Sequence, residues 1–183
     1  MKSLFIQYKA VIKFVFIFLI TYVVLTMVYK FYLQYSEGSN FYPDYVTNLV
    51  ALQTDNILHG LGFSSEVLPH ETEPSMKIIL NGKFVARVIE GCNGLSVIIL
   101  FLSFIVAFSG KLKTTFFYIL SGSVLIYVVN LIRIVILTIA LYYYPEHREI
   151  LHSVVFPAII YGLVFLLWVF WVNRFSKSNV KDA

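Results

Sequence analysis

Three residues far apart in the sequence carry side chains suited to acyl-transfer chemistry. Cys92 is the only cysteine of the chain, and it lies in the polar, turn-forming stretch Glu90-Gly91-Cys92-Asn93-Gly94. A cysteine supplies a nucleophile, and a histidine such as His152 can accept its proton and pass it on. Arg133 supplies a fixed positive charge for a developing oxyanion. If these side chains meet, they form a nucleophile, an acid–base group and an oxyanion-stabilising group.

Each of these residues also has a plain structural interpretation. A lone cysteine is often a small buried hydrophobic side chain, and an arginine in an apolar run can snorkel or form a structural ion pair. The setting of Cys92 is polar, however, and Arg133 is the only charged residue in its apolar run. Asn130 precedes Arg133 by three residues and therefore shares its helix face. Two polar groups on one face of an apolar helix indicate an inward-facing polar site.

The elements that must bring these residues together are apolar helices. The chain has 183 residues, of which 59% are hydrophobic and 13% charged, and its mean hydropathy is +0.81. This composition is typical of an integral membrane protein rather than a soluble domain. About 20 apolar residues cross a hydrocarbon core of about 30 Å as a helix. We therefore predict an all-α integral membrane protein that forms one membrane domain, residues 1–183, with about four transmembrane helices, at residues 11–31, 94–109, 114–143 and 153–172.

The first apolar run has a second interpretation, as a cleaved signal peptide. We disfavour it because the run at residues 11–31 is too long and no A-x-A-like cleavage site follows it. The single cysteine excludes an intramolecular disulfide and a multi-cysteine metal site. We expect neither a metal ion nor another cofactor.

The longest polar segment, residues 34–92, is predicted to lie outside the membrane as an external loop. Asp44 can cap a helix that runs to about Gly60. Apolar residues on one face of this helix, among them Val46 and Ile57, suit a helix that lies on the membrane surface.

The end of the external loop carries the signature of a β-hairpin. The segments 76–80 and 83–89 flank Asn81-Gly82, a dipeptide typical of a type I′ turn. Pairing across this turn places Leu80 opposite Lys83 and Ile78 opposite Val85. We therefore expect a surface helix and a small β-hairpin in the external loop.

The distribution of charge predicts the orientation of the chain. On one side of a four-span arrangement lie the basic residues Lys2, Lys9, Lys13, Lys111, Lys113, Arg174, Lys177 and Lys181, with Asp182 as the only acid. The other side carries most of the acidic residues, from Glu37 to Glu149. The positive-inside rule then places both termini in the cytoplasm and the loop outside. Because the basic residues flank apolar runs, they indicate contact with the lipid bilayer and not with nucleic acid.

The motifs together resemble the exosortase/archaeosortase family. Glu90-x-Cys92-Asn93-Gly94 is followed by Asn130-x-x-Arg133 late in one span and by His152 at the opening of the next. The similarity covers most of residues 85–172, and it is closest to the F-type exosortases of Bacteroidetes. The family usually has a serine where Asn93 stands, so a role for a serine hydroxyl does not carry over. Many relatives also have more spans, which makes this chain a small, core-only form.

The resemblance implies an exosortase-like cysteine transpeptidase or peptidase in the bacterial cytoplasmic (inner) membrane, multi-pass, with its active site facing the periplasm. Its substrates would be exported proteins with a C-terminal motif, a transmembrane helix and a basic tail. Cys92 would attack a backbone carbonyl, Arg133 would stabilise the oxyanion and His152 would protonate the leaving amine. Glu90, Asn93 and Asn130 would support them. The acyl group would then pass to an acceptor nucleophile.

Two other functions are compatible with the residues. A non-catalytic membrane assembly factor or chaperone could hold a partner's transmembrane helix, in which case the thiol has no function. A small transporter is less favoured because the sequence contains no inverted repeat and no paired broken spans. A membrane partner protein is compatible with the enzyme as well as with the assembly factor.

Overall fold

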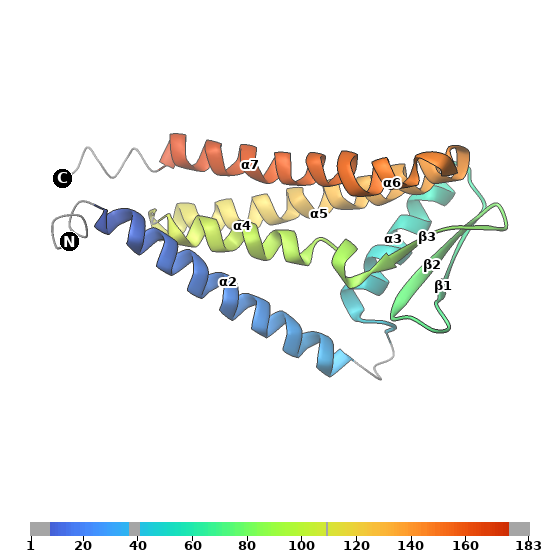
Figure 1. The fold of residues 1–183 in the computed structure, drawn as a ribbon, viewed down its shortest axis with the longest axis horizontal. Helices are drawn as coiled ribbons and strands as arrows, with labels where there is room; N and C mark the ends of the chain where they lie inside the picture. Colours follow the sequence, from blue (N-terminus) through green and yellow to red (C-terminus); the bar gives the residue numbers. More distant parts are fainter. Residues whose placement is uncertain (1–7, 37–40, 109, 176–183) are drawn as a thin grey trace.

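The computed structural model describes residues 8–36, 41–108 and 110–175. Several charged residues of the orientation argument lie outside these ranges, namely Lys2, Glu37, Lys177, Lys181 and Asp182. The described chain forms a bundle of apolar helices, with a three-stranded sheet and one further helix at one end of it (Figure 1).

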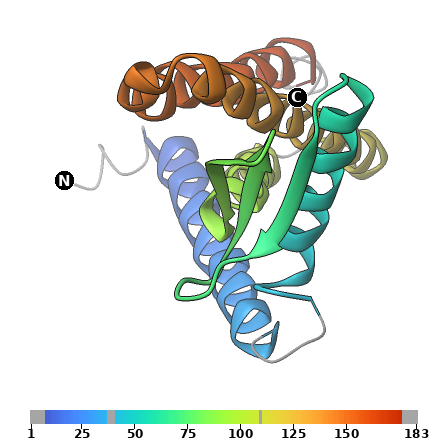
Figure 2. The same cartoon turned by 90° about the vertical axis from the view of Figure 1, so that its right-hand side faces the viewer.

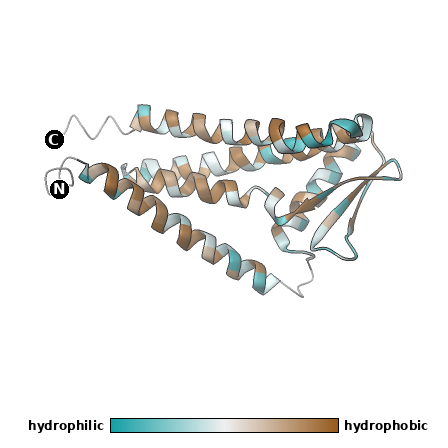
Figure 3. Ribbon diagram, viewed as in Figure 1, coloured by the Kyte–Doolittle hydropathy of each residue, from teal (hydrophilic) through white to brown (hydrophobic). Residues whose placement is uncertain are grey.

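Helices α2 (Lys9–Ser36), α4 (Leu95–Ala107), α5 (Leu112–Tyr143) and α7 (Phe156–Phe175) make up the bundle. They alternate in direction, so the start of α2 and the end of α7 lie at the same end, opposite the sheet (Figure 1). Apolar residues dominate these helices, whereas hydrophilic residues gather towards the end that carries the sheet (Figure 3). This arrangement fits the predicted all-helical membrane domain.

Three helical segments of the described chain are long and apolar enough to cross a membrane: Lys9–Ser36, Leu112–Tyr143 and Pro145–Phe175. The predicted span 94–109 is also a helix, but α4 has only 13 residues. At a rise of 1.5 Å per residue it measures about 20 Å, less than a hydrocarbon core of about 30 Å. The count of four spans therefore stays a prediction. The last apolar segment begins at Pro145, earlier than the predicted residue 153.

The bundle core lies between α4, α5 and α7. Its buried side chains are Phe101, Ile105, Ile126, Ile160, Val164 and Trp171. Gly122 of α5 makes room for the ring of Phe101, because a Cβ at this glycine would overlap the ring. Helix α2 packs on the outside of α4, where the ring of Phe14 lies 4.5 Å from that of Phe108, measured between centroids. The hydrophobic effect does not drive helices together inside a membrane, so such close van der Waals packing is what holds them in contact.

The sheet contains the predicted hairpin and one strand that the sequence did not reveal. Strands β1 (Ser65–Pro69), β2 (Ser75–Leu80) and β3 (Lys83–Ile89) are antiparallel in the order β1-β2-β3. Asn81 and Gly82 have φ of 51° and 77°, as a type I′ turn requires. Leu80 pairs with Lys83, as predicted.

The second predicted pair of the hairpin is wrong. Ile78 lies opposite Ala86, and not opposite Val85, because the register shifts between Ile78 and Ile79. Phe84 is paired and Val85 is not, so Val85 is the extra residue of a β-bulge. The shift places Ala86 and Val88 on the buried face of the sheet.

Helix α3 (Tyr45–Gly60) has the predicted boundaries and the predicted cap. The Asp44 side chain accepts hydrogen bonds from the backbone N–H groups of Val46 and Thr47, at 3.0 and 3.1 Å. We predicted that its apolar face lies on the membrane surface. In the structure this face packs against the sheet and α5 instead. The buried residues of this cluster are Val50, Ala51, Leu58, Met76, Ile78, Leu80, Val88, Ile134 and Val135. Viewed from the sheet end, the strands lie between α3 and α2 (Figure 2).

Candidate active site

Cys92 lies at the junction between the sheet and the bundle. Strand β3 leads directly into the 3₁₀ turn η1 (Glu90–Cys92), and α4 begins three residues after Cys92. Gly94 is the N-cap of α4 and has a left-handed φ of 86°, which glycine adopts without strain. A Cβ at this position would also lie 3.2 Å from Nδ2 of Asn130. The glycine thus allows both the turn and the close approach of α5.

Asn130 connects the cysteine turn to Arg133. Its Nδ2 donates a hydrogen bond to the backbone carbonyl of Cys92 at 2.8 Å, and its Oδ1 accepts one from Nη1 of Arg133 at 3.2 Å. The Asn130 side chain is buried, and the Nε of Arg133 is buried without a hydrogen-bond partner in the described part of the chain. An unpaired buried donor is costly, so this guanidinium retains bonding capacity for an acceptor.

Asn93 has a structural position beside the cysteine. Its buried amide donates to the hydroxyls of Tyr29 and Thr47, at 2.9 and 3.1 Å, and its Oδ1 accepts from the backbone N–H of Leu95 at 3.0 Å. One side chain therefore links α2, α3 and the start of α4. A serine has a single hydroxyl proton and could not donate to both partners, so an asparagine anchors this turn in a way that a serine could not.

Glu90 is exposed, and its backbone carbonyl accepts hydrogen bonds from the hydroxyl of Tyr29 at 3.5 Å and from the N–H of Asn93 at 3.4 Å. Its carboxylate forms no ion pair with Arg133 or His152 in the described structure. The expected supporting residue therefore lies near Cys92 in the chain without a defined side-chain partner.

His152 lies across a pocket from the cysteine turn. It belongs to the π-helical turn η3 (Leu151–Val155), which follows the short helix α6 (Arg148–Ile150) and precedes α7. Cys92 and His152 both line this pocket of about 490 Å³. Its other lining residues are Ala86, Arg87, Ile89, Leu141, Glu146, Arg148, Glu149 and Ser153. π-Helical turns occur frequently at functional sites.

The structure thus brings two of the three predicted residues into one pocket and connects the third to it indirectly. Arg133 does not line the pocket, but it reaches the backbone of Cys92 through Asn130. Sequence reasoning missed the charged wall formed by Glu146, Arg148 and Glu149. The cluster of charged residues directly before His152 in the sequence could have indicated this wall.

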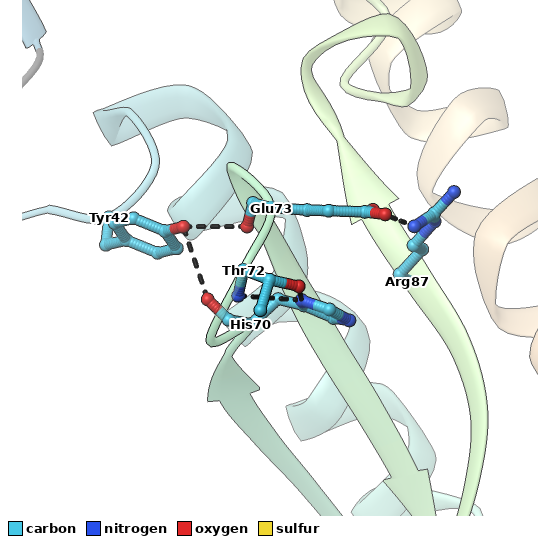
Figure 4. Close-up of polar contacts among 5 residues, drawn as sticks. All are labelled: Tyr42, His70, Thr72, Glu73 and Arg87. Atoms are coloured by element: carbon cyan, nitrogen blue, oxygen red, sulfur yellow. Dashed lines mark hydrogen bonds and ion pairs between the residues drawn. The ribbon is translucent and has the colours of Figure 1, made fainter.

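A polar cluster holds the turn between β1 and β2 against β3 (Figure 4). The hydroxyl of Tyr42 donates to the backbone carbonyls of His70 and Glu73, at 3.3 and 2.7 Å. The Glu73 carboxylate forms an ion pair with Arg87 of β3. The guanidinium of Arg87 is therefore engaged beside the pocket, and the strand is fixed close to Cys92.

No group of three or more histidine, cysteine, aspartate or glutamate residues that could hold a metal ion occurs among the described residues.

The sequence profile of a family described as "Transmembrane exosortase" matches residues 4–173 of the chain. The match includes the sheet, the residues that line the pocket and the bundle helices, except for the last two residues of α7. No curated protein matches the chain, and no solved structure does.

Proposed function

Because the chain belongs to the transmembrane exosortase family, we propose that it is a membrane cysteine transpeptidase that cleaves C-terminal sorting signals of exported proteins. Family membership and the apolar helices together make it a membrane protein. The observation that carries the proposal for this chain is the single pocket that Cys92 and His152 both line.

The reaction would begin with proton transfer from the Cys92 thiol to His152. The thiolate attacks a backbone carbonyl carbon of the substrate, and the carbonyl oxygen becomes an oxyanion. The tetrahedral intermediate collapses to a thioester, and the leaving amine takes the proton from His152. An acceptor amine then attacks the thioester and releases the thiol; with water as acceptor, the outcome is hydrolysis.

Arg133 and Asn130 would act around this step in different ways. The guanidinium supplies positive charge towards the oxyanion at a distance, since Arg133 does not line the pocket and its Nε is buried. Asn130 is a positioning residue, since it holds the backbone of Cys92 and one nitrogen of Arg133. Asn93 supports the same turn from the other side through Tyr29.

The finer identity follows from the resemblance and the charge distribution. We propose an F-type exosortase of the inner membrane, with the pocket on the periplasmic side. Its partners would be exported proteins with a C-terminal motif, a transmembrane helix and a basic tail, together with the bilayer. Five basic residues that support this orientation belong to the start of α2, the start of α5 or the end of α7, which lie opposite the sheet (Figure 1): Lys9, Lys13, Lys111, Lys113 and Arg174.

Covalent trapping tests the central role of Cys92. Membranes that contain the full chain and exported proteins of the same cell are separated by gel electrophoresis without reducing agent, and adducts of the chain are identified by mass spectrometry. We expect an adduct that hydroxylamine cleaves, as it does a thioester. The Cys92→Ala variant should insert into the membrane normally, form no adduct and leave the substrate uncleaved.

His152→Ala provides a second readout. It should slow cleavage by about 100-fold or more, as removal of a general acid–base group usually does. Cleavage of the substrate at the native rate by Cys92→Ala would overturn the enzymatic proposal and leave a helix-holding assembly factor as the function.

A further inference from the structure

Strand β3 leaves one side of its backbone unpaired, and this side leads to Cys92. In the described part of the chain the sheet has only the order β1-β2-β3, so β3 is an edge strand. No backbone hydrogen bond joins β3 to an element other than β2 within the described residues. Edge strands with free N–H and C=O groups are templates for pairing with another chain.

The hydrogen bonds of β2 decide which residues of β3 face outward. The N–H of Asn81 donates to the carbonyl of Ser64, and the N–H of His70 donates to the carbonyl of Ser75. The odd-numbered residues of β2 therefore point their backbone groups to β1, and its even-numbered residues point theirs to β3.

The register then transfers this alternation to β3. The even-numbered residues of β2 lie opposite Lys83, Ala86 and Val88. These residues of β3 bond inward, so the backbone groups of Arg87 and Ile89 point away from the sheet. Arg87 and Ile89 are also the residues that line the pocket together with Cys92.

The opposite edge of the sheet is protected, and the edge at β3 is not. Strand β1 ends in Pro69, which by the same alternation stands at an outward position and offers no N–H. Ser65 of β1 is tied to Asp55 of α3, whose carboxylate accepts from its hydroxyl at 2.5 Å. Proline and coverage are common devices against edge pairing. Strand β3 contains no proline.

Two pockets lie along β3. At one end, the pocket that contains Cys92 and His152 is lined by Ala86, Arg87 and Ile89. At the other end, a second pocket of about 150 Å³ is lined by Lys83, Phe84 and Val85. The two pockets share Leu141 and Arg148. The remaining lining residues therefore come from the end of α5 and from the connection between α5 and α7.

Resting on the proposed function, we propose that the substrate segment next to the cleaved bond binds as an added strand on the free edge of β3. Its backbone pairs with the N–H and C=O groups of Arg87 and Ile89, and the bond to be cleaved then lies at Cys92, three residues beyond Ile89. From Phe84 to Ile89 the edge measures about 17 Å at 3.4 Å per residue. This length accommodates about five residues of an extended peptide.

The two sides of the binding site have different roles: β3 provides affinity through its backbone, and the facing residues provide selectivity. The Arg87 guanidinium is engaged with Glu73, so the strand offers its backbone rather than this charge. Backbone pairing does not depend on the substrate's side chains, whereas pockets for alternate side chains give selectivity. Arg148 and Glu149 also line the pocket, and their charges can bind polar side chains of the substrate.

Proline substitution on β3 tests this pairing with the full chain in its native membrane. Arg87→Pro removes an outward N–H and leaves the bonds to β2 intact, and Arg87→Ala is the matched control that also loses the ion pair with Glu73. The probe is the thioester adduct of Cys92 with the substrate identified by trapping. We expect about tenfold less adduct for the proline variant than for the alanine variant, as for the loss of one hydrogen bond. Ile89→Pro should behave in the same way relative to Ile89→Ala.

Membrane level and protease resistance serve as folding readouts. Arg87→Pro should retain both, whereas Val88→Pro should lose protease resistance because its N–H bonds to β2. If the fold of Arg87→Pro is lost, the Ile89 pair decides by itself; if Ile89→Pro also loses its fold, both residues bond inward and the proposal is overturned.

The outcomes separate this inference from the proposed function. Equal amounts of adduct for the proline and alanine variants would overturn strand addition while the role of Cys92 stands. Absence of the adduct in the unmodified protein would remove the proposed function itself. A change confined to dimers of the chain on native gels, with unchanged adduct, would show that a second copy occupies the edge and would also overturn the proposal.

Discussion

Asn130 is the residue on which the geometry of the candidate site depends most. It is buried in an apolar helix. Its amide nitrogen donates to the carbonyl of Cys92, and its amide oxygen accepts from the guanidinium of Arg133. Sequence reasoning placed it on the same helix face as Arg133, which is correct. It did not predict the bond to Cys92, because contacts between distant segments depend on how the helices pack.

A substitution at Gly94 tests this dependence. Gly94→Ala should place a methyl group 3.2 Å from the amide nitrogen of Asn130 and force a side chain into a left-handed backbone. The backbone conformation alone costs about 1–2 kcal/mol. We expect roughly tenfold slower formation of the Cys92 adduct, measured by its appearance over time.

Gly60→Ala is the matched control for this experiment. Gly60 ends α3, and a Cβ there meets no atom within 4 Å. This variant should form the adduct at the native rate. Equal rates for both variants would mean that the contact between Gly94 and Asn130 has no bearing on the reaction.

At the scale of elements, the sequence predicted those whose signal is local. The cap at Asp44, the turn at Asn81-Gly82 and the long apolar runs each contain their signal within a few residues. Strand β1 was missed because Ser65–Pro69 mixes polar residues with a proline and gains its order from pairing with β2. The bulge at Val85 was missed because it also depends on contacts with distant residues. The shifted register places Ala86 in a cluster with Leu137, Leu141 and Phe156.

Packing between α4 and α5 sets where the cysteine turn can lie. Gly122→Leu should drive the side chain into the ring of Phe101 and separate the two helices. Overpacking of this kind costs about 1–3 kcal/mol. We expect a lower midpoint of thermal unfolding for the detergent-solubilised protein. Gly162→Leu on α7, where a Cβ meets nothing within 4 Å, should leave the midpoint unchanged. An equal effect of the two substitutions would exclude the Gly122–Phe101 contact as its cause.

At the scale of the whole molecule, orientation in the membrane is the property that controls function. The alternating helices place the beginning of α2 and the end of α7 at one end and the sheet at the other (Figure 1). Cys92 follows the sheet directly, and His152 shares its pocket. The charge distribution predicts that the sheet end faces outward. Helix α4, with 13 residues, lies between α2 and α5 in the chain and connects the sheet end to the opposite end.

Reporter fusions measure this orientation directly. A reporter that is active only outside the cytoplasm should be active when inserted at Gly82, in the turn between β2 and β3, and inactive when fused after Lys181. We expect this result because basic residues are in excess at the end of the bundle opposite the sheet, and such segments face the cytoplasm. Activity at Lys181, or its absence at Gly82, would contradict the predicted orientation.

The hydrogen bond between Asn130 and the Cys92 carbonyl joins residues 38 positions apart in the chain. During synthesis, the sheet and the cysteine therefore emerge from the ribosome before the helix that holds them in position. The histidine of the pocket emerges later still. A nascent chain that ends before η3 carries the Cys92 thiol but lacks His152, the residue to which the proposed function assigns the proton. The pocket that Cys92 and His152 both line is therefore complete only after the chain has been synthesised past residue 152.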